Sequence, residues 1–330
     1  MIKAFVFGKF LPFHRGHEAM IRFALTQCDF LSVLVCYDNE EYISGEIRKS
    51  WIADTFAGVS NLEVKVLQYD NRLLPNTSET SLSVSKTWSA EFKKLFPDYD
   101  LVVTSEPYGE MVAGFMGIGH VPFDLDKSRY PISASIIRND LFTNWHYLPE
   151  AVKPYFALKV VILGTESTGK TTLTEQLARH YNCSFVLEAG RDLIPDSTNF
   201  TFDDLLMVGR EHAKRITEAI LGGSPLVIID TDIHITESYA KFVFNTSLQV
   251  DSAIYAINNA NLYLYLNNDV PYYQDGTRLN NSDRDLLDIS HRETLKAHRI
   301  NLVEITGSWQ KRFEQAVSEI DRLILGKPTI

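Results

Sequence analysis

The sequence has few cysteines, no long apolar run and no excess of basic residues, and each shortage argues against a class of protein. Three cysteines, Cys28, Cys36 and Cys183, occur without a CxxC pair, so a disulfide framework is not expected and a reducing, cytoplasmic location is favoured. No segment approaches the roughly 20 apolar residues of a membrane-spanning helix. The first residues, MIKAFVFGKF, lack the features of a signal peptide. We therefore expect no membrane partner.

Positive charge is scarce as well. Lysine and arginine number 32 against 42 aspartates and glutamates, which gives a formal net charge of -10. A surface of that sign repels a polyphosphate backbone, so nucleic acid is not an expected partner. A small anion is different, because a few local amides and basic side chains suffice to bind one phosphate group. The composition favours small-molecule ligands and leaves open whether the chain forms a homo-oligomer.

Short apolar runs alternate with amphipathic stretches along the chain. In the first half, strands are expected at 4–8, 31–37, 62–69 and 101–106, and helices at 17–28, 46–57, 81–96 and 134–142. The alternation restarts after the proline-containing segment 144–155, with strands at 157–164, 185–190, 225–230, 262–267 and 302–306 and helices at 170–181, 202–222, 235–247, 283–298 and 308–325. This pattern predicts two α/β domains, 1–152 and 153–330, each with a parallel sheet covered by helices.

The most specific motif follows the strand expected at 157–164. Residues 164–171 read Gly-Thr-Glu-Ser-Thr-Gly-Lys-Thr and fit GxxxxGK[ST] without mismatch. Such a loop turns backbone N–H groups around a phosphate, its lysine contacts the β- and γ-phosphates of ATP, and its last hydroxyl binds Mg²⁺. The residues expected to bind ATP here are Gly164, Thr165, Glu166, Ser167, Thr168, Gly169, Lys170, Thr171 and Thr172.

Acidic residues follow the strand expected at 225–230. Asp230 ends an apolar run, and an acid in that position is costly unless it is used, so we interpret it as a ligand of Mg²⁺ or the acceptor of a substrate proton. Asp232 has two interpretations, a second functional acid or the N-cap of the next helix. The sequence leaves open which of the two faces the metal.

Charged residues also gather near the carboxyl ends of other strands in this half. Glu188 and Arg191 fall where ligands of doubly wound sheets bind. They either hold hydroxyl groups of a phosphate acceptor or form a surface ion pair. The turn-rich stretch 267–284 contains Arg278 and Arg284. These arginines either form a basic lid that stabilises the transferred phosphoryl group or are solvated.

A second phosphate-binding pattern lies at the start of the chain. Residues 8–17, Gly-Lys-Phe-Leu-Pro-Phe-His-Arg-Gly-His, follow the first strand and open the first helix. His14 and His17 are three apart, so both rings can face one site and bind ATP phosphates around the α-phosphorus. Two structural histidines, or a metal bound together with Asp38, are the alternatives. The order of glycine, aromatic, proline and histidine residues favours the nucleotide.

This loop resembles the HxGH-containing loop of nucleotidylyltransferases. The segment Ile-Ser-Ala-Ser-Ile-Ile-Arg at 132–138 resembles their second signature, in which serines at a helix start and an arginine bind the β- and γ-phosphates of ATP. The resemblance assigns ATP binding in the first domain to Gly8, Lys9, Phe10, His14, His17, Ser133, Ser135 and Arg138. Hydroxyl groups and an arginine at a helix start are also the groups that suit an anion.

The two motifs in this order resemble the NadR-type bifunctional family, which joins nicotinamide mononucleotide (NMN) adenylyltransferase to ribosylnicotinamide kinase. The likeness includes Arg48-x-x-Trp51, Glu188-x-x-Arg191, Asp230-Thr231-Asp232 and Asp275-Gly276-Thr277-Arg278. It implies a Rossmann-like nucleotidylyltransferase domain followed by a P-loop kinase domain. The kinase would convert nicotinamide riboside and ATP to NMN. The first domain would then use a second ATP to give NAD and pyrophosphate, with Mg²⁺ at both sites and NAD as product or feedback ligand.

The resemblance also implies roles for individual residues. It assigns catalysis to His14, His17, Arg138, Lys170, Asp230 and Arg278, with Arg278 also binding ATP. It assigns substrate binding to Arg48, Trp88, Glu188, Arg191, Asp230, Asp232 and Asp275. Mg²⁺ would be bound by Thr171 and Asp230.

Two features depart from the family pattern. Family members often begin with a helix-turn-helix, whereas the first strand expected here begins near residue 2. The stretch expected to contact nicotinamide, often Pro-Asn-Gly-Trp-like, reads Leu-Pro-Asn-Thr-Ser-Glu at 74–79. Trp88 either supplies the missing stacking ring or belongs to the core. A different phosphorylated acceptor, or a nucleotide sensor without turnover, are therefore the alternatives to NAD synthesis.

Overall fold

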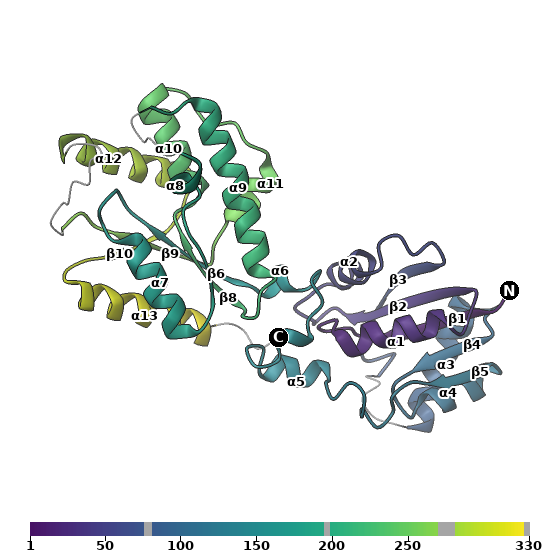
Figure 1. Cartoon of the computed structure of the whole chain (residues 1–330). Coiled ribbons are helices and arrows are strands. Elements are labelled where there is room, and N and C mark those ends of the chain that lie inside the picture. Colours follow the sequence, from purple (N-terminus) through teal and green to yellow (C-terminus); the bar gives the residue numbers. More distant parts are fainter. Residues whose placement is uncertain (76–80, 195–198, 270–280, 327–330) are drawn as a thin grey trace. The chain divides into compact units, whose positions relative to one another are not determined.

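The computed structural model describes residues 1–75, 81–194, 199–269 and 281–326 (Figure 1). The chain divides into two compact units, one from Met1 to Lys153 and the other from Pro154 onward. The described residues of each unit form a five-stranded sheet in which every strand pairing is parallel. The predicted fold class, parallel sheets covered by helices, is confirmed.

Unit 1 builds its sheet in the order β3-β2-β1-β4-β5. Its strands are β1 (Lys3–Gly8), β2 (Phe30–Asp38), β3 (Leu62–Tyr69), β4 (Leu101–Thr104) and β5 (Gly119–Pro122), and its helices are α1 (Arg15–Leu25), α2 (Gly45–Thr55), α3 (Leu82–Leu95), α4 (Gly109–Met116), α5 (Ala134–Asn139) and the 3₁₀ turn η1 (Trp145–Tyr147). The strand order changes direction between β1 and β4. Ligands of such folds bind outside the carboxyl ends of the strands at that point.

An aromatic core fixes the position of β1. Phe5 and Phe7 point to the same face of the sheet and pack against Phe92 of α3 and against Phe96, which directly follows that helix. The rings of Phe5 and Phe96 stack with their centroids 4.6 Å apart. Helices α3 and α4 cover this face, and α1 and α2 cover the other (Figure 1). Because close-packed interiors deform little, the loop that begins at Gly8 starts from a rigid strand end.

Unit 2 builds its sheet in the order β10-β9-β6-β8-β7. Its strands are β6 (Leu158–Leu163), β7 (Ser184–Val186), β8 (Leu226–Asp230), β9 (Leu262–Leu266) and β10 (Leu302–Ile305), and its helices are α6 (Lys153–Phe156, at the junction), α7 (Lys170–Tyr181), α8 (Gly190–Leu193), α9 (Phe202–Ile220), α10 (Ile233–Phe244), α11 (Ser252–Asn258), α12 (Asn281–Ala297) and α13 (Trp309–Leu325). Strand β6 is central and pairs with β8 and β9. The loop after β6 therefore lies beside the end of β8.

The core of unit 2 is aliphatic. Val160 and Ile162 of β6 pack with Leu177 of α7 and Ile320 of α13, so these two helices cover one face of the sheet. Helix α9 packs on β7 and β8, and α10 packs between α9 and α12. Helix α7, which follows the phosphate loop, is held by strands β6 and β8 and by α13.

Side-chain caps set where several helices begin. Ser81 and Ser133 each accept a hydrogen bond from the amide three residues later, and Ser308 does the same for α13, as its position in the sequence suggests. Helix α1 differs, because Nδ1 of His14 accepts from the amide of His17 at 3.4 Å. A residue expected to bind nucleotide is therefore also the residue that starts the helix.

The structure corrects the expected elements at several places, and α11 (Ser252–Asn258) is one helix that the sequence did not predict. Helix α4 and strand β5 were not anticipated, because residues 109–122 are rich in glycine and contain no sustained apolar run. The strand expected at 185–190 ends at Val186, and a short helix begins at Gly190. Within the described residues, no helix is both long and apolar enough to cross a membrane.

Candidate functional sites

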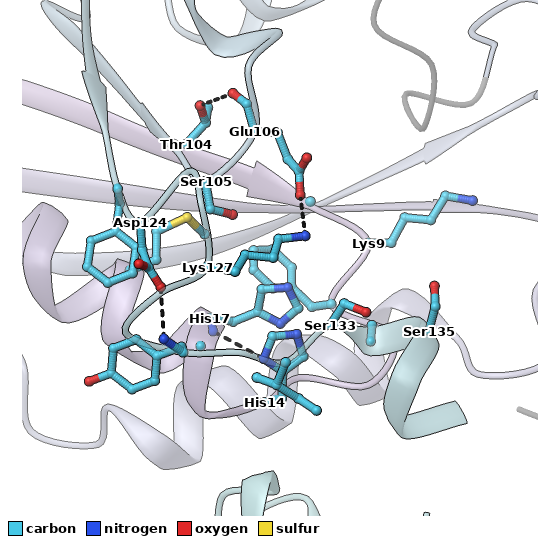
Figure 2. Close-up of a pocket in the computed structure, with 18 of the residues that line it drawn as sticks. Lys9, His14, His17, Thr104, Ser105, Glu106, Asp124, Lys127, Ser133 and Ser135 are labelled. Carbon is cyan, nitrogen blue, oxygen red and sulfur yellow. Dashed lines mark hydrogen bonds and ion pairs between the residues drawn. The ribbon is translucent and has the colours of Figure 1, made fainter. Parts of the chain in front are cut away.

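A cavity of about 410 Å³ opens at the carboxyl ends of β1 and β4 in unit 1 (Figure 2). Its wall combines the end of β1, the start of α1 and the start of α5. It contains every residue that the sequence assigns to ATP binding in this unit: Gly8, Lys9, Phe10, His14, His17, Ser133, Ser135 and Arg138. The fold therefore brings together two motifs that lie more than one hundred residues apart, as the hydrogen bond from Arg138 to Leu11 also shows.

His14 and His17 stack on one wall of this cavity, with ring centroids 3.7 Å apart. Burial, together with the positive charge of Lys127, lowers the pKa of His14 to about 3. Burial, then His14 and Lys127, hold the pKa of His17 well below its ordinary 6.5. Within the described part of the chain, Nδ1 of His17 is buried without a hydrogen-bond partner. The wall thus consists of two neutral imidazoles with nitrogens left for a ligand.

The alternative of a metal bound by His14, His17 and Asp38 finds no support. The Asp38 carboxylate instead lies 3.7 Å from the ammonium group of Lys9. Across the described ranges, no three histidine, cysteine, aspartate or glutamate side chains are arranged to hold a metal ion.

Arg48 lies beneath the phosphate loop and not in the cavity. Its side chain is fully buried, Nη1 donates to the carbonyl of Lys9 at 3.0 Å, and Nε donates to the carbonyl of Ile43 at 3.0 Å. Nη2 lies 2.6 Å from Glu41, whose other oxygen lies 2.6 Å from the Lys9 ammonium. Burial works against the charge of Lys9, but Glu41 more than offsets it, so the pKa of Lys9 is raised. Arg48 thus contacts the phosphate loop itself, and the substrate contact that the resemblance implies for it stays a prediction.

The second motif presents two hydroxyl groups and a guanidinium. Ser133 caps α5 by accepting from the amide of Ile136 at 3.3 Å, which leaves its own hydroxyl hydrogen to donate. Arg138 donates to the carbonyl of Leu11 at 2.5 Å and to the hydroxyl of Ser135 at 3.0 Å. The arginine therefore ties the start of α5 to the loop between β1 and α1.

Other residues of the cavity wall were not identified from the sequence. One group, at and just after the end of β4, includes Thr104, Ser105 and Glu106, and a second group, after β5, includes Asp124, Lys127 and Tyr130. The residues at the end of β4 could have been placed at this site, because β4 lies beside β1 and parallel strands end at one edge of a sheet. The second group follows β5, which was itself not expected.

Trp88 lies in the core of unit 1. Its side chain is 2% exposed, its indole N–H donates to the carbonyl of Pro75 at 2.8 Å, and its ring packs against Tyr69 and Phe92. Of the two interpretations of this residue, the structure supports the core tryptophan. Most of the neighbouring stretch 74–79 lies outside the described residues.

In unit 2, two glycines allow the phosphate loop its shape. Gly164 and Gly169 have φ angles of +138° and +86°, a region that side chains disfavour. A Cβ atom on Gly164 would lie 2.6 Å from the carbonyl oxygen of Leu266, and one on Gly169 would lie 2.1 Å from the ring of Trp309. Both positions therefore require glycine for backbone conformation and for space.

The loop closes around its own lysine. Lys170 donates to the carbonyl of Thr165 at 3.0 Å, and the hydroxyl of Thr168 donates to the same carbonyl at 2.8 Å. Arg312, buried on α13, donates to the carbonyl of Thr168 at 2.9 Å. Arg284 of α12 donates to the hydroxyl of Thr165 at 3.2 Å and is buried, so it is not a solvated arginine.

Asp230 ends β8 with a fully buried side chain. Its Oδ2 accepts from the Thr171 hydroxyl at 2.5 Å, whereas its Oδ1 has no hydrogen-bond partner among the described residues. Burial raises the pKa of Asp230, although the nearby Lys170 opposes that shift. A buried carboxylate oxygen without a partner, beside a threonine hydroxyl, suits a hard cation such as Mg²⁺.

Asp232 is the N-cap of α10, one of its two predicted roles. Its Oδ1 accepts from the amides of His234 at 3.1 Å and Ile235 at 3.2 Å, and its Oδ2 lies 2.6 Å from Nδ1 of His234. Both carboxylate oxygens are therefore engaged. Between the two acids, Asp230 is the one with an oxygen left for a ligand.

Glu188 and Arg191 form an ion pair of 3.5 Å at the end of β7, with the arginine 56% exposed. The charge of Glu188 also contributes to the raised pKa of Asp230, after burial. Val186 of β7 pairs with Ile229 of β8, so Glu188, two residues beyond Val186, lies near the end of β8. Asp275 and Arg278, the remaining predicted site residues, lie outside the described residues.

Comparisons with known proteins agree with this geometry. Residues 159–312 match the family model of the AAA domain. The trifunctional NAD biosynthesis/regulator protein NadR of Salmonella typhimurium is 27% identical over 342 residues, which cover 97% of this chain and 82% of the relative. The chain resembles NadR along nearly its whole length.

The NadR-type resemblance predicted from the motifs is thereby confirmed. A crystal structure of NadR in complex with NR superimposes with a TM-score of 0.67 at 18% identity, covering 97% of this chain and 96% of the other. A nicotinamide-nucleotide adenylyltransferase of Thermoplasma acidophilum is 24% identical over 105 residues, or 32% of this chain and 56% of the relative. NadR thus shares its fold with both units, and sequence similarity links the chain to an adenylyltransferase as well.

Proposed function

We propose that the chain is a bifunctional enzyme of NAD synthesis. Unit 2 phosphorylates the 5′-hydroxyl of nicotinamide riboside with ATP to give NMN, and unit 1 transfers the adenylyl group of a second ATP to NMN to give NAD and pyrophosphate. The observation that carries this proposal is the presence of two complete phosphate loops in one chain, each at the carboxyl edge of its own sheet. The similarity to NadR, named for NAD biosynthesis, supports the choice of substrates.

In the kinase reaction, the 5′-hydroxyl oxygen attacks the γ-phosphorus, the bond to the β–γ bridging oxygen breaks, and the hydroxyl proton is released to solvent water. Lys170 exchanges its bond to the carbonyl of Thr165 for the phosphate oxygens. Thr171 and Asp230 would hold Mg²⁺, which neutralises phosphate charge when bound. Glu188 lies near Asp230, and we assign it to the hydroxyl groups of the riboside.

In the adenylyl transfer, an NMN phosphate oxygen attacks the α-phosphorus and pyrophosphate leaves. Because Nδ1 of His14 accepts the His17 amide, the neutral ring of His14 carries its proton on Nε2 and donates from there. Ser133, Ser135 and Arg138 bind the leaving pyrophosphate from the opposite motif. Neither reaction needs a covalent intermediate, since positioning and charge stabilisation supply the rate.

Two substitutions test the assignment of one reaction to each unit. Lys170→Ala is expected to lower NMN formation from nicotinamide riboside by roughly 10²–10³-fold and to leave NAD formation from supplied NMN intact. His17→Ala is expected to do the reverse. Both products are measured by chromatography after incubation with ATP and Mg²⁺. A folded variant that lost both activities would contradict the assignment.

The identity of the acceptor is tested on the unaltered chain. Pyrophosphate release is followed with NMN and with other phosphorylated nucleosides and cofactor precursors. NMN is expected to be the best acceptor, and a faster alternative would replace NAD synthesis as the function of unit 1. Tight binding of ATP or NAD without turnover would identify a nucleotide sensor.

A further inference from the structure

Among the described residues, three lysine or arginine side chains line the cavity of unit 1, and protein partners hold them to different degrees. Lys9 lies 2.6 Å from Glu41 and is partly buried. Arg138 donates to a backbone carbonyl and to a serine. Lys127 lies 3.3 Å from Glu106, and both side chains of this pair are more than 40% exposed. Lys127 is therefore the cation whose protein contact is the weakest.

The exposed pair can open at little cost. Exposed ion pairs typically add little to the stability of a protein. A contact between an ammonium group and a phosphate is a charge-assisted hydrogen bond, which is stronger than a neutral one. An incoming triphosphate can therefore replace Glu106 as the partner of Lys127.

The backbone holds Lys127 toward the cavity. Lys127 and Asp124 have φ angles of +53° and +46°, a left-handed conformation that is unfavourable for a residue with a side chain. The carboxylate of Asp124 accepts from the amides of Arg129 at 3.0 Å and Tyr130 at 2.9 Å, and its carbonyl accepts from the amide of Lys127 at 2.9 Å. These bonds stabilise a turn that would otherwise be unfavourable.

The side chain of Lys127 extends over the histidine wall. Figure 2 shows its ammonium group between Glu106 and the ring of His17. Its positive charge contributes to the lowered pKa values of both His14 and His17. A phosphate that the two imidazoles bind would therefore also be within reach of Lys127.

We propose that Lys127 is a further catalytic residue of unit 1, which exchanges Glu106 for the phosphates of ATP and stabilises the charge that develops on pyrophosphate. That charge appears as the bond between the α-phosphorus and its bridging oxygen breaks and the electron pair moves to the departing oxygen. Glu106 holds the lysine in place before ATP enters. This proposal rests on the adenylyl transfer proposed for unit 1.

The first experiment removes the positive charge of Lys127 in one variant and keeps it in another. Lys127→Met is expected to lower kcat for NAD formation from supplied NMN by roughly 10²-fold, and Lys127→Arg is expected to recover most of that loss. Phosphorylation of nicotinamide riboside by unit 2 in the same samples reports the amount of folded protein and should not change. Lys49→Met is the matched control, because Lys49 forms an ion pair of similar length, 3.4 Å, with Glu46 on α2.

The second experiment removes the competing carboxylate. Glu106→Gln is expected to lower KM for ATP up to about fivefold, the fold-change that corresponds to a weak surface pair, and this gain should vanish when Lys127→Met is also present. If Lys127→Met keeps the wild-type kcat, or if Lys127→Arg is as slow as Lys127→Met, the proposal is overturned. If the unaltered chain forms no NAD, the proposed function of unit 1 fails first, so the two failures are distinguishable.

Discussion

In unit 1 the phosphate loop rests on the guanidinium group of Arg48, and in unit 2 it rests on that of Arg312. Arg48 donates to the carbonyl of Lys9, 39 positions away, and Arg312 donates to the carbonyl of Thr168, 144 positions away. Both side chains are almost completely buried. In both loops, therefore, a guanidinium group from another helix donates hydrogen bonds to backbone carbonyl groups of the loop. The amide groups of the loop are left to bind phosphate.

The groups that face the phosphate differ. Unit 1 offers two neutral imidazoles, hydroxyl groups and cations spread around an open cavity. Unit 2 wraps its loop around Lys170 next to the buried Asp230. The first arrangement suits attack in the middle of the triphosphate, where groups must contact both sides of the α-phosphorus. The second suits transfer of the terminal phosphate, which the loop encloses from one end.

The largest expected effect tests the buried arginine that supports the phosphate loop in each unit. Removing one partner of a buried ion pair typically costs 3–5 kcal/mol, and Glu41, the partner of Arg48, is 11% exposed. Asp269, the partner of Arg312, is 40% exposed. Arg48→Met is therefore expected to lower the free energy of unfolding of unit 1 by about 3 kcal/mol, and Arg312→Met to lower that of unit 2 by less. Urea titrations of the two transitions measure both.

Each of these variants should also slow only the reaction of its own unit. Arg72→Met, which removes an exposed arginine from unit 1, is the control and should change neither stability nor rate. If Arg48→Met left adenylyl transfer at the wild-type rate, the loop would not depend on this contact.

A smaller effect on stability is expected from lowering the pH, and it should differ between the two units. In the unfolded chain a histidine takes up a proton near pH 6.5, whereas His14 and His17 of unit 1, and His212 and His291 of unit 2, have lowered pKa values in the fold because they are buried. The contribution of these histidines to the free energy of unfolding is fully present above pH 6.5. It falls as the pH drops below that value, by up to about 1.4 kcal/mol for each such histidine between pH 7.5 and 5.5.

In unit 2, His234 contributes a pH dependence of stability of the opposite sign. Burial opposes the charge of His234, but Asp232 outweighs burial and raises its pKa, so this histidine contributes stability that is present below pH 6.5 and is lost as the pH rises through the folded value. Unit 1 is therefore expected to lose more stability than unit 2 between pH 7.5 and 5.5. Urea titrations at three pH values check this, and an equal loss in both units would contradict it.

The smallest effect concerns Trp88. A core role predicts that Trp88→Phe lowers the free energy of unfolding of unit 1 by about 1–2 kcal/mol, through lost packing and the lost bond to Pro75, with KM for NMN unchanged. Initial rates and a urea titration measure both quantities. A tenfold rise in KM without loss of stability would instead place the ring at the acceptor.

Local motifs were the part of both sites that the sequence could predict. The loops at 8–17 and 164–171 are continuous in the chain, and the parallel sheets place their partners, Ser133 and Asp230, at the same edges. The contacts of Arg48 and Arg312 could not be predicted, because they join a side chain to backbone carbonyls of a distant loop and leave no residue pattern. Lys127 was missed because the strand before it, Gly119–Pro122, is too short and too polar to recognise.

Trp309, whose ring leaves no space for a side chain at Gly169, gives the chain an intrinsic fluorescent probe. Of the four tryptophans, Trp51, Trp88 and Trp145 are at most 3% exposed, whereas Trp309 is 53% exposed. Emission that a water-soluble quencher can reach therefore comes mainly from the ring beside the kinase loop, next to Arg312. The quencher-accessible part of the fluorescence can thus follow events at the phosphate loop of unit 2 in the unlabelled protein.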